Sequence, residues 1–279
     1  MLGYVASFTN VVAIATANVF AGKATLLRDW RITFRFTSSI ILLIALIFSF
    51  FDSATFQSRD FFIGVASGIS GGIGIPLAYK AFAKGPVAYV SPLLSVVQTS
   101  AIVIFAAATG ESIQPILVIA FFLGIVGVYL AGKPKVLKAS NLMWVSITTI
   151  AAAFCFSGFS IGMTQIADGQ NITGLAGART GVFLIAFSIV RRGSLKSDER
   201  SASSWLLLTV FSALMEFLAN YTYVLAITHL DLAKVGIIIA TSSIFATLIS
   251  IPVMKQRPRL INWAGILIAT ISLVLVAIS

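Results

Sequence analysis

One acidic residue, Glu216, lies in the middle of a long apolar stretch, within SALMEFLANYTYVLA (212–226). A charged side chain at the centre of a bilayer costs roughly 2.5–3.5 kcal/mol, so such a residue is expected to have a partner or a role. If the stretch is helical, five polar residues share one face of the helix: Thr209, Ser212, Glu216, Asn220 and Tyr223. We expect this polar stripe to face other helices or a water-filled cavity rather than lipid.

The carboxylate of Glu216 could serve transport or structure. In the first case it binds a cationic group of a substrate or takes up a driving proton. In the second it forms an ion pair with Arg179 or Arg35, or stays protonated and hydrogen-bonds between helices. The sequence leaves both alternatives open, with the functional one slightly favoured because acids inside membranes so often carry function.

Two arginines also lie inside apolar stretches. Arg35 and Arg179 could each hold a substrate carboxylate through two parallel hydrogen bonds. The alternative is an arginine that reaches the membrane surface while its aliphatic stem stays in the apolar zone. Arg35 follows a basic segment closely, which favours this alternative for it, whereas for Arg179 the two interpretations are equal.

Uncharged polar residues complete the candidate substrate-binding or proton-coupling site. Gln98 and Ser243 are placed at equivalent positions by a shift of 145 residues, and Tyr79 joins Tyr223 as a candidate aromatic wall. Such side chains orient ligands, but in membrane proteins they equally often form hydrogen bonds between helices or anchor at the interface. One histidine and one cysteine exclude a metal cluster and an internal disulfide, so we expect neither metal nor cofactor.

The composition shows which elements must position these residues. Hydrophobic residues make up 58% of the 279 residues, charged residues only 10%, and the mean hydropathy is +1.02. A soluble domain carries about 25% charged residues, so the chain is predicted to be an all-α polytopic protein of the cell (inner or plasma) membrane. The net charge of +10 is dispersed between apolar runs, which argues against a nucleic-acid partner.

Ten transmembrane helices are predicted from the apolar runs and the Gly, Pro, Asn and Asp residues between them. They cover residues 3–27, 32–51, 61–82, 88–108, 115–131, 142–166, 172–190, 205–228, 232–254 and 260–278. The connections are short and leave no room for a soluble domain.

The basic residues concentrate in the loops that follow the odd-numbered spans, at 28–31, 80–84, 133–138, 191–200 and 255–259. The positive-inside rule therefore places these loops in the cytoplasm and both termini outside. The pattern is inverted between residues 1–138 and 139–279, as expected for two inverted five-helix repeats with a site between them. A weak internal similarity, which aligns Arg35 with Arg179, supports the same division.

Several short motifs resemble the ten-helix, EamA-type branch of the drug/metabolite transporter superfamily. They are ANVFAGKA (17–24), the Arg35–Phe36 pair, AYKAFAKGPVAYVSPL (78–93), and TGESI (109–113) followed by FFLGIVGVYL (121–130). The resemblance covers nearly the whole chain and implies a carrier with a central cavity. It also implies cytoplasmic termini, against the charge distribution, so the orientation and the direction of transport stay open.

Three further features bear on the packing and the ends of the helices. In GVASGISGGIGIP (64–76), Gly64, Gly68 and Gly72 recur every four residues and predict a flat face for a close helix contact. Pro76 and Pro92 are expected to interrupt the third and fourth spans and to permit bending. Glu111, which precedes the fifth span, is expected at a helix N-terminus, where the macrodipole stabilises an anion.

These observations favour a secondary transporter that moves a small organic metabolite, amino-acid-like or otherwise amphiphilic, by alternating access, with protons as a candidate coupling ion. A non-transporting membrane subunit or scaffold is the main alternative, but it leaves the polar stripe unexplained. A membrane enzyme acting on lipid-linked substrates is less favoured, because its clustered acids, histidines or metal ligands are missing from the sequence. We expect no enzymatic activity; the expected partners are a small-molecule substrate and the lipid bilayer, and the expected state is a monomer or homodimer.

Overall fold

The computed structural model describes residues 1–52, 56–84, 87–131, 142–167, 169–189, 202–254 and 259–278. These residues form eleven α-helices: α1 (Leu2–Leu27), α2 (Trp30–Phe51), α3 (Ser58–Lys84), α4 (Val87–Ala108), α5 (Pro115–Ala131), α6 (Leu142–Met163), α7 (Asn171–Ile189), α8 (Ala202–Ile227), α9 (Leu232–Ala240), α10 (Ser242–Met254) and α11 (Leu260–Ala277). The boundary predicted between residues 138 and 139 lies outside the described residues.

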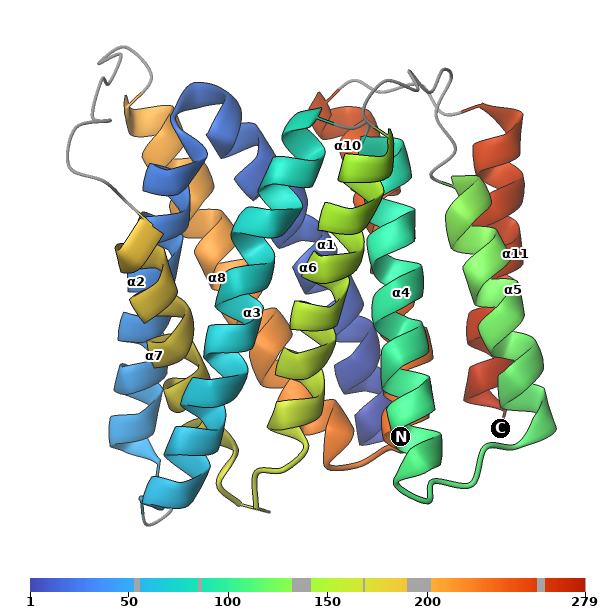
Figure 1. The fold of residues 1–279 in the computed structure, drawn as a ribbon, viewed down its shortest axis with the longest axis horizontal. Helices are drawn as coiled ribbons and strands as arrows, with labels where there is room; N and C mark the ends of the chain where they lie inside the picture. Colours follow the sequence, from blue (N-terminus) through green and yellow to red (C-terminus); the bar gives the residue numbers. More distant parts are fainter. Residues whose placement is uncertain are drawn as a thin grey trace.

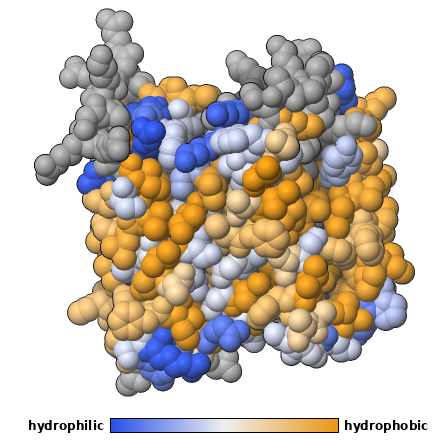
Figure 2. Space-filling view, viewed as in Figure 1, coloured by the Kyte–Doolittle hydropathy of each residue, from blue (hydrophilic) through white to orange (hydrophobic). Residues whose placement is uncertain are grey.

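The helices run side by side in one bundle, and both chain termini lie at the same end of it (Figure 1). On the face shown in Figure 2, a broad hydrophobic belt crosses the middle, and hydrophilic residues gather at both ends. Among the described residues, α1, α2, α3, α6, α7 and α8 are each long and apolar enough to cross a membrane, and shorter apolar helices accompany them. The predicted all-α polytopic membrane fold is confirmed.

The ninth predicted span is not one continuous helix. It is divided into α9 and α10 at Thr241, whose backbone N–H bonds to the carbonyl of Ile238 at 3.1 Å, a tightened last turn. The Thr241 hydroxyl donates to the same carbonyl at 2.6 Å. This short-range bonding closes α9 within the apolar run, which hydropathy alone could not indicate.

The glycine face of α3 packs against α7, as its four-residue spacing predicted. A methyl group added at Gly68 would overlap the carbonyl oxygen of Ala178, and one added at Gly64 would overlap that of Gly174. The contact is reciprocal, since a methyl group at Gly177 would overlap the carbonyl oxygen of Phe61. The two backbones can approach this closely only because these positions lack side chains.

The prolines have less effect on the helices than expected. Helix α3 continues through Pro76 to Lys84, and α4 continues past residue 92 to Ala108. The sequence prediction that both helices are interrupted is therefore wrong at the level of secondary structure. A membrane helix can accommodate a proline where neighbouring helices and polar side chains compensate for the lost hydrogen bond.

Glu111 does lie at a helix N-terminus, but not that of the helix it precedes. Its two carboxylate oxygens accept hydrogen bonds from the backbone N–H groups of Leu232 at 2.9 Å and Ala233 at 3.0 Å, in the first turn of α9. The carboxylate thus satisfies two otherwise free donors at the positive end of the α9 dipole. In this way the turn between α4 and α5 is tied to α9.

Candidate functional site in the bundle interior

The polar stripe of α8 faces the interior of the bundle. The lipid side of this helix is marked by Leu207, Leu214 and Leu218, which are 71%, 45% and 37% exposed. Glu216 is two residues from both Leu214 and Leu218, and two residues correspond to a rotation of about 200° around a helix. Its carboxylate therefore points away from the lipid side and toward the other helices.

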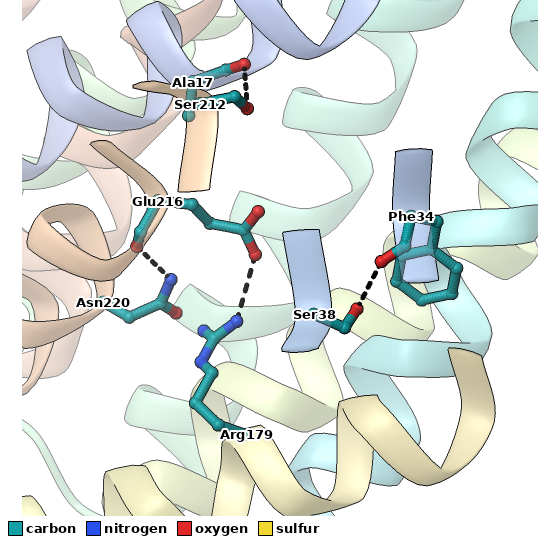
Figure 3. Close-up of polar contacts among 7 residues, drawn as sticks. All are labelled: Ala17, Phe34, Ser38, Arg179, Ser212, Glu216 and Asn220. Atoms are coloured by element: carbon teal, nitrogen blue, oxygen red, sulfur yellow. Dashed lines mark hydrogen bonds and ion pairs between the residues drawn. The ribbon is translucent and has the colours of Figure 1, made fainter. Parts of the chain in front are cut away.

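Glu216 forms an ion pair with Arg179 of α7 across the interior (Figure 3). Arg179 Nη1 lies 3.0 Å from Glu216 Oε1. The two partners differ in burial, because the side chain of Arg179 is 4% exposed and that of Glu216 is 23% exposed. Since Glu216 faces inward, we attribute its exposed part to interior space beside the pair.

Packing holds the guanidinium of Arg179 in place. The preceding residue, Ala178, is fully buried against the glycine face of α3, and the ring centroid of Phe159 in α6 lies 5.7 Å from the guanidinium carbon. The Nε of Arg179 is buried and has no hydrogen-bond partner within the described part of the chain. A buried cation with an unused donor depends strongly on its one counter-ion, because breaking such a pair costs about 3–5 kcal/mol.

The internal repeat aligns Arg35 with Arg179, but the structure places the two arginines in different surroundings. Arg35 does not reach Glu216; its guanidinium carbon lies 3.7 Å from the ring centroid of Phe187 in α7. Phe187 is 37% exposed, so this cation–π contact lies at the periphery of the bundle. The placement agrees with the interpretation of Arg35 as an interfacial side chain.

The remaining polar residues of the α8 stripe bond to the protein itself. The side-chain amide of Asn220 donates to the carbonyl of Glu216 at 2.6 Å, one turn earlier in the same helix (Figure 3). The hydroxyl of Tyr223 is buried and donates to the carbonyl of Ser160 in α6 at 2.9 Å. Ser212 donates to the carbonyl of Ala17 in α1 at 2.9 Å. The stripe thus connects α8 to α1 and α6, and Glu216 and Asn220 are its partly exposed members.

Tyr79 is the other candidate near the ion pair. It interacts electrostatically with Glu216, and its ring centroid lies 5.4 Å from that of Trp30 at the start of α2. Gln98 and Ser243 have no described hydrogen bond or ion pair with Glu216 or Arg179. The backbone carbonyl of Gln98 accepts from Ser157 at 3.2 Å, and the Ser243 hydroxyl donates to the carbonyl of Ala240 at 3.1 Å.

One polar residue in α1 was missed by the sequence reasoning. The side-chain amide of Asn10 donates to the carbonyl of Ala219 in α8 at 2.6 Å, and Asn10 is 5% exposed. Its side-chain oxygen is buried and unpartnered among the described residues. An asparagine within an apolar run is the signal that could have drawn attention to it, because lipid leaves such a side chain unsatisfied.

Comparison with known proteins agrees with this architecture. A solved crystal structure matches with a TM-score of 0.79 over 99% of this chain and 96% of its own, at 15% sequence identity, which shows a shared fold. No curated protein sequence matches the chain. Residues 143–278 match the EamA-like transporter family. The second half of the chain is therefore similar to the EamA-like transporter family, in agreement with the resemblance seen in the sequence motifs.

Proposed function

We propose that this protein is a secondary transporter that moves a small organic metabolite across the membrane by alternating access. The observation that carries the proposal is the ion pair between Arg179 and Glu216, whose carboxylate is partly open to the interior. A partly accessible charge inside an apolar bundle has a free-energy cost, and the binding of a ligand or a proton would explain why the charge is present. The similarity of residues 143–278 to a transporter family supports the same class of function.

The exposure of the pair favours a substrate with a positive group. The carboxylate is the accessible partner, whereas the guanidinium is enclosed. A protonated amine, or a proton, can therefore approach Glu216 and compete with Arg179 for it. An amino-acid-like or other amphiphilic compound would place its amine at Glu216, and Tyr79 with Trp30 would offer aromatic surface to its apolar part.

We further propose that residues 1–138 and 139–279 are two inverted repeats. The helix pairing supports this division, because α1 packs on α8 as α3 packs on α6, and α5 packs on α11. The repeat also pairs the α3–α7 contact with the α2–α8 contact. Glycines allow the backbones of α3 and α7 to lie in close contact. By contrast, α2 and α8 meet through larger side chains; for example, the Trp205 indole donates a hydrogen bond to the Thr33 hydroxyl at 3.0 Å.

This asymmetry supports alternating access, since one member of a symmetric pair of contacts is tightly closed while the other is held apart by side chains. The protein would act as a monomer or homodimer in the inner or plasma membrane. Its partners would be the small-molecule substrate, the bilayer and, in a coupled mechanism, protons.

The test has two stages. The purified protein is first screened for ligands that raise its melting temperature, using a panel of amines, amino acids and related metabolites. Uptake of a stabilising compound is then measured in proteoliposomes that contain the wild type, Glu216→Gln or, as the matched control, Glu111→Gln. We expect uptake to be lost in Glu216→Gln and retained in Glu111→Gln, because only Glu216 faces the interior space.

Normal uptake by Glu216→Gln at all pH values would exclude the proposed role of the carboxylate. A panel in which no compound stabilises the protein would instead favour a non-transporting scaffold.

A further inference from the structure

A groove lies between α3 and α6, near the end of the bundle that carries the chain termini. It has a volume of about 460 Å³, within the range of about 300–1,000 Å³ typical of ligand sites. It is lined by Arg59, Ile63, Ala66 and Ser67 of α3, by Gly158 and Gly162 of α6, and by Gln165 just after the end of α6. From Arg59 to Ala66 the groove extends about 10 Å along the helix.

Small side chains create this groove on the outer surface of the bundle. Gly158 and Gly162 lie against the hydroxyl groups of Ser70 and Ser67 of α3, so they bring the two helices together at the floor. Ala66 is exposed and leaves the space above it open. Between its ends the groove is lined mainly by Ile63, Ala66, Ser67 and the two glycines, and the polar groups Arg59 and Gln165 lie at the end nearest the water.

Arg59 forms no ion pair with another described residue. The ion pairs within the described residues are Arg179–Glu216 and Lys234–Asp231, and the exposed Arg59 takes part in neither. The neighbouring Asp60 is fully buried and accepts a hydrogen bond from the backbone N–H of Ala167 at 3.1 Å. Arg59 also lies in the first turn of α3, where the helix dipole disfavours a cation but attracts an anion.

The level of Arg59 in the membrane fits a lipid headgroup. Phe56 and Phe62, on either side of it in sequence, are 64% and 67% exposed, so apolar side chains face lipid at this depth. An arginine at this level reaches the interface with its guanidinium. Figure 2 shows a weakly polar stripe on this face that descends between hydrophobic regions toward a hydrophilic end.

We propose that this groove binds an anionic phospholipid, with the phosphate at Arg59 and an acyl chain between α3 and α6. Charge complementarity selects an anionic headgroup, and the apolar length of the groove selects a chain rather than a free phosphate. The groove does not fit a helix of a second copy, because Gly158 and Gly162 already contact serines of α3 in the same chain. The proposal is independent of the transport function.

The test is native mass spectrometry of the purified full-length protein, titrated with dioleoyl-phosphatidylglycerol or dioleoyl-phosphatidylcholine. We expect the wild type to prefer phosphatidylglycerol and Arg59→Gln to bind it about fivefold more weakly, as expected for one interfacial charge, with phosphatidylcholine unchanged. Ala66→Phe, which fills the groove, should weaken both lipids. The matched controls are Arg31→Gln, an exposed arginine in α2, and Ala264→Phe, an exposed position in α11, and both should bind like the wild type.

Equal binding of both lipids by the wild type would overturn the proposal, as would a loss of binding in the controls equal to that in the two groove variants. Displacement of phosphatidylglycerol by millimolar inorganic phosphate would show a phosphate site instead, and dimers that Ala66→Phe abolishes would show a protein interface. Either of these results would also overturn it.

Discussion

Arg179 and Glu216 share one ion pair but not one environment: the guanidinium is 4% exposed and the carboxylate, 3.0 Å away, is 23% exposed. Loss of either partner leaves the other charge unpaired, yet the consequences differ. An unpaired Arg179 would remain an enclosed cation, because an arginine does not deprotonate in proteins. An unpaired Glu216 would remain partly accessible to water, because its side chain is 23% exposed.

We therefore predict that Glu216→Gln destabilises the protein more than Arg179→Gln. The cost should be about 3–5 kcal/mol for Glu216→Gln and clearly less for Arg179→Gln. Thermal unfolding in detergent measures the difference in stability between the two variants. Equal losses of unfolding free energy in the two variants would contradict the difference in solvent access that we assign to Arg179 and Glu216.

The apolar double variant Arg179→Met with Glu216→Leu separates stability from function. Replacement of a buried ion pair by apolar residues of similar volume is often neutral or stabilising. We predict that this variant unfolds at a temperature close to that of the wild type but does not transport the ligand found in the screen. Uptake at the wild-type rate would show that the pair is only structural.

The α3–α7 contact should tolerate no added methyl group at Gly68. A Cβ there would lie 2.7 Å from the carbonyl carbon of Ala178 and 2.8 Å from its Cα, and backbone cannot move aside cheaply. We predict that Gly68→Ala lowers the free energy of unfolding by roughly 1–3 kcal/mol. Gly124→Ala in α5 is the control, because its Cβ would meet only the Ser272 hydroxyl at 3.0 Å. A larger effect at Gly124 would disprove the tight α3–α7 contact.

Glu111 should stabilise α9 through its two hydrogen bonds to the first turn and through its negative charge. We predict that Glu111→Ala costs about 0.5–2 kcal/mol, the usual range for loss of a helix cap, and that Glu111→Gln costs less because its amide retains one acceptor. Asp231→Asn is the comparison. Asp231 precedes α9 but makes no side-chain cap, and its side chain is 63% exposed and lies as far as 3.8 Å from the Lys234 ammonium, so its loss should be nearly neutral. Urea or thermal unfolding in detergent measures these losses of stability, and a larger loss for Asp231→Asn than for Glu111→Ala would contradict the assigned cap.

Tyr223 and Tyr221 provide a matched pair on one helix. Tyr223 is 4% exposed and bonds to Ser160 of α6, whereas Tyr221 is 38% exposed on the lipid side. Removal of the hydroxyl in Tyr223→Phe should cost about 1 kcal/mol, and Tyr221→Phe should be neutral. If both variants unfold like the wild type, the hydrogen bond to α6 contributes nothing measurable.

The positions of the helices could be predicted from sequence because span length and apolar composition are set by the bilayer itself. The inward direction of Glu216 followed in the same way from the spacing of the polar residues on α8. By contrast, the break at Thr241 depends on a local hydrogen bond inside an apolar run, and hydropathy does not detect it.

The choice between long-range partners could not be made from the chain alone. Arg179 and Arg35 were both candidate partners of Glu216, but only the packing of α7 against α3 brings Arg179 to it. Glu111 was assigned correctly to a helix N-terminus, yet the helix it caps is 121 residues away. The free amide oxygen of Asn10 likewise became visible only once α1 was placed against α8.

The central claim, that Glu216 faces water inside the bundle, can be measured directly. The chain has one cysteine, so Cys155→Ser provides a background in which Glu216→Cys or the lipid-facing control Leu214→Cys is labelled. In proteoliposomes, a membrane-impermeant methanethiosulfonate reagent should modify Glu216→Cys and leave Leu214→Cys unmodified. Labelling of neither variant from either side of the membrane, or of Leu214→Cys alone, would contradict the account.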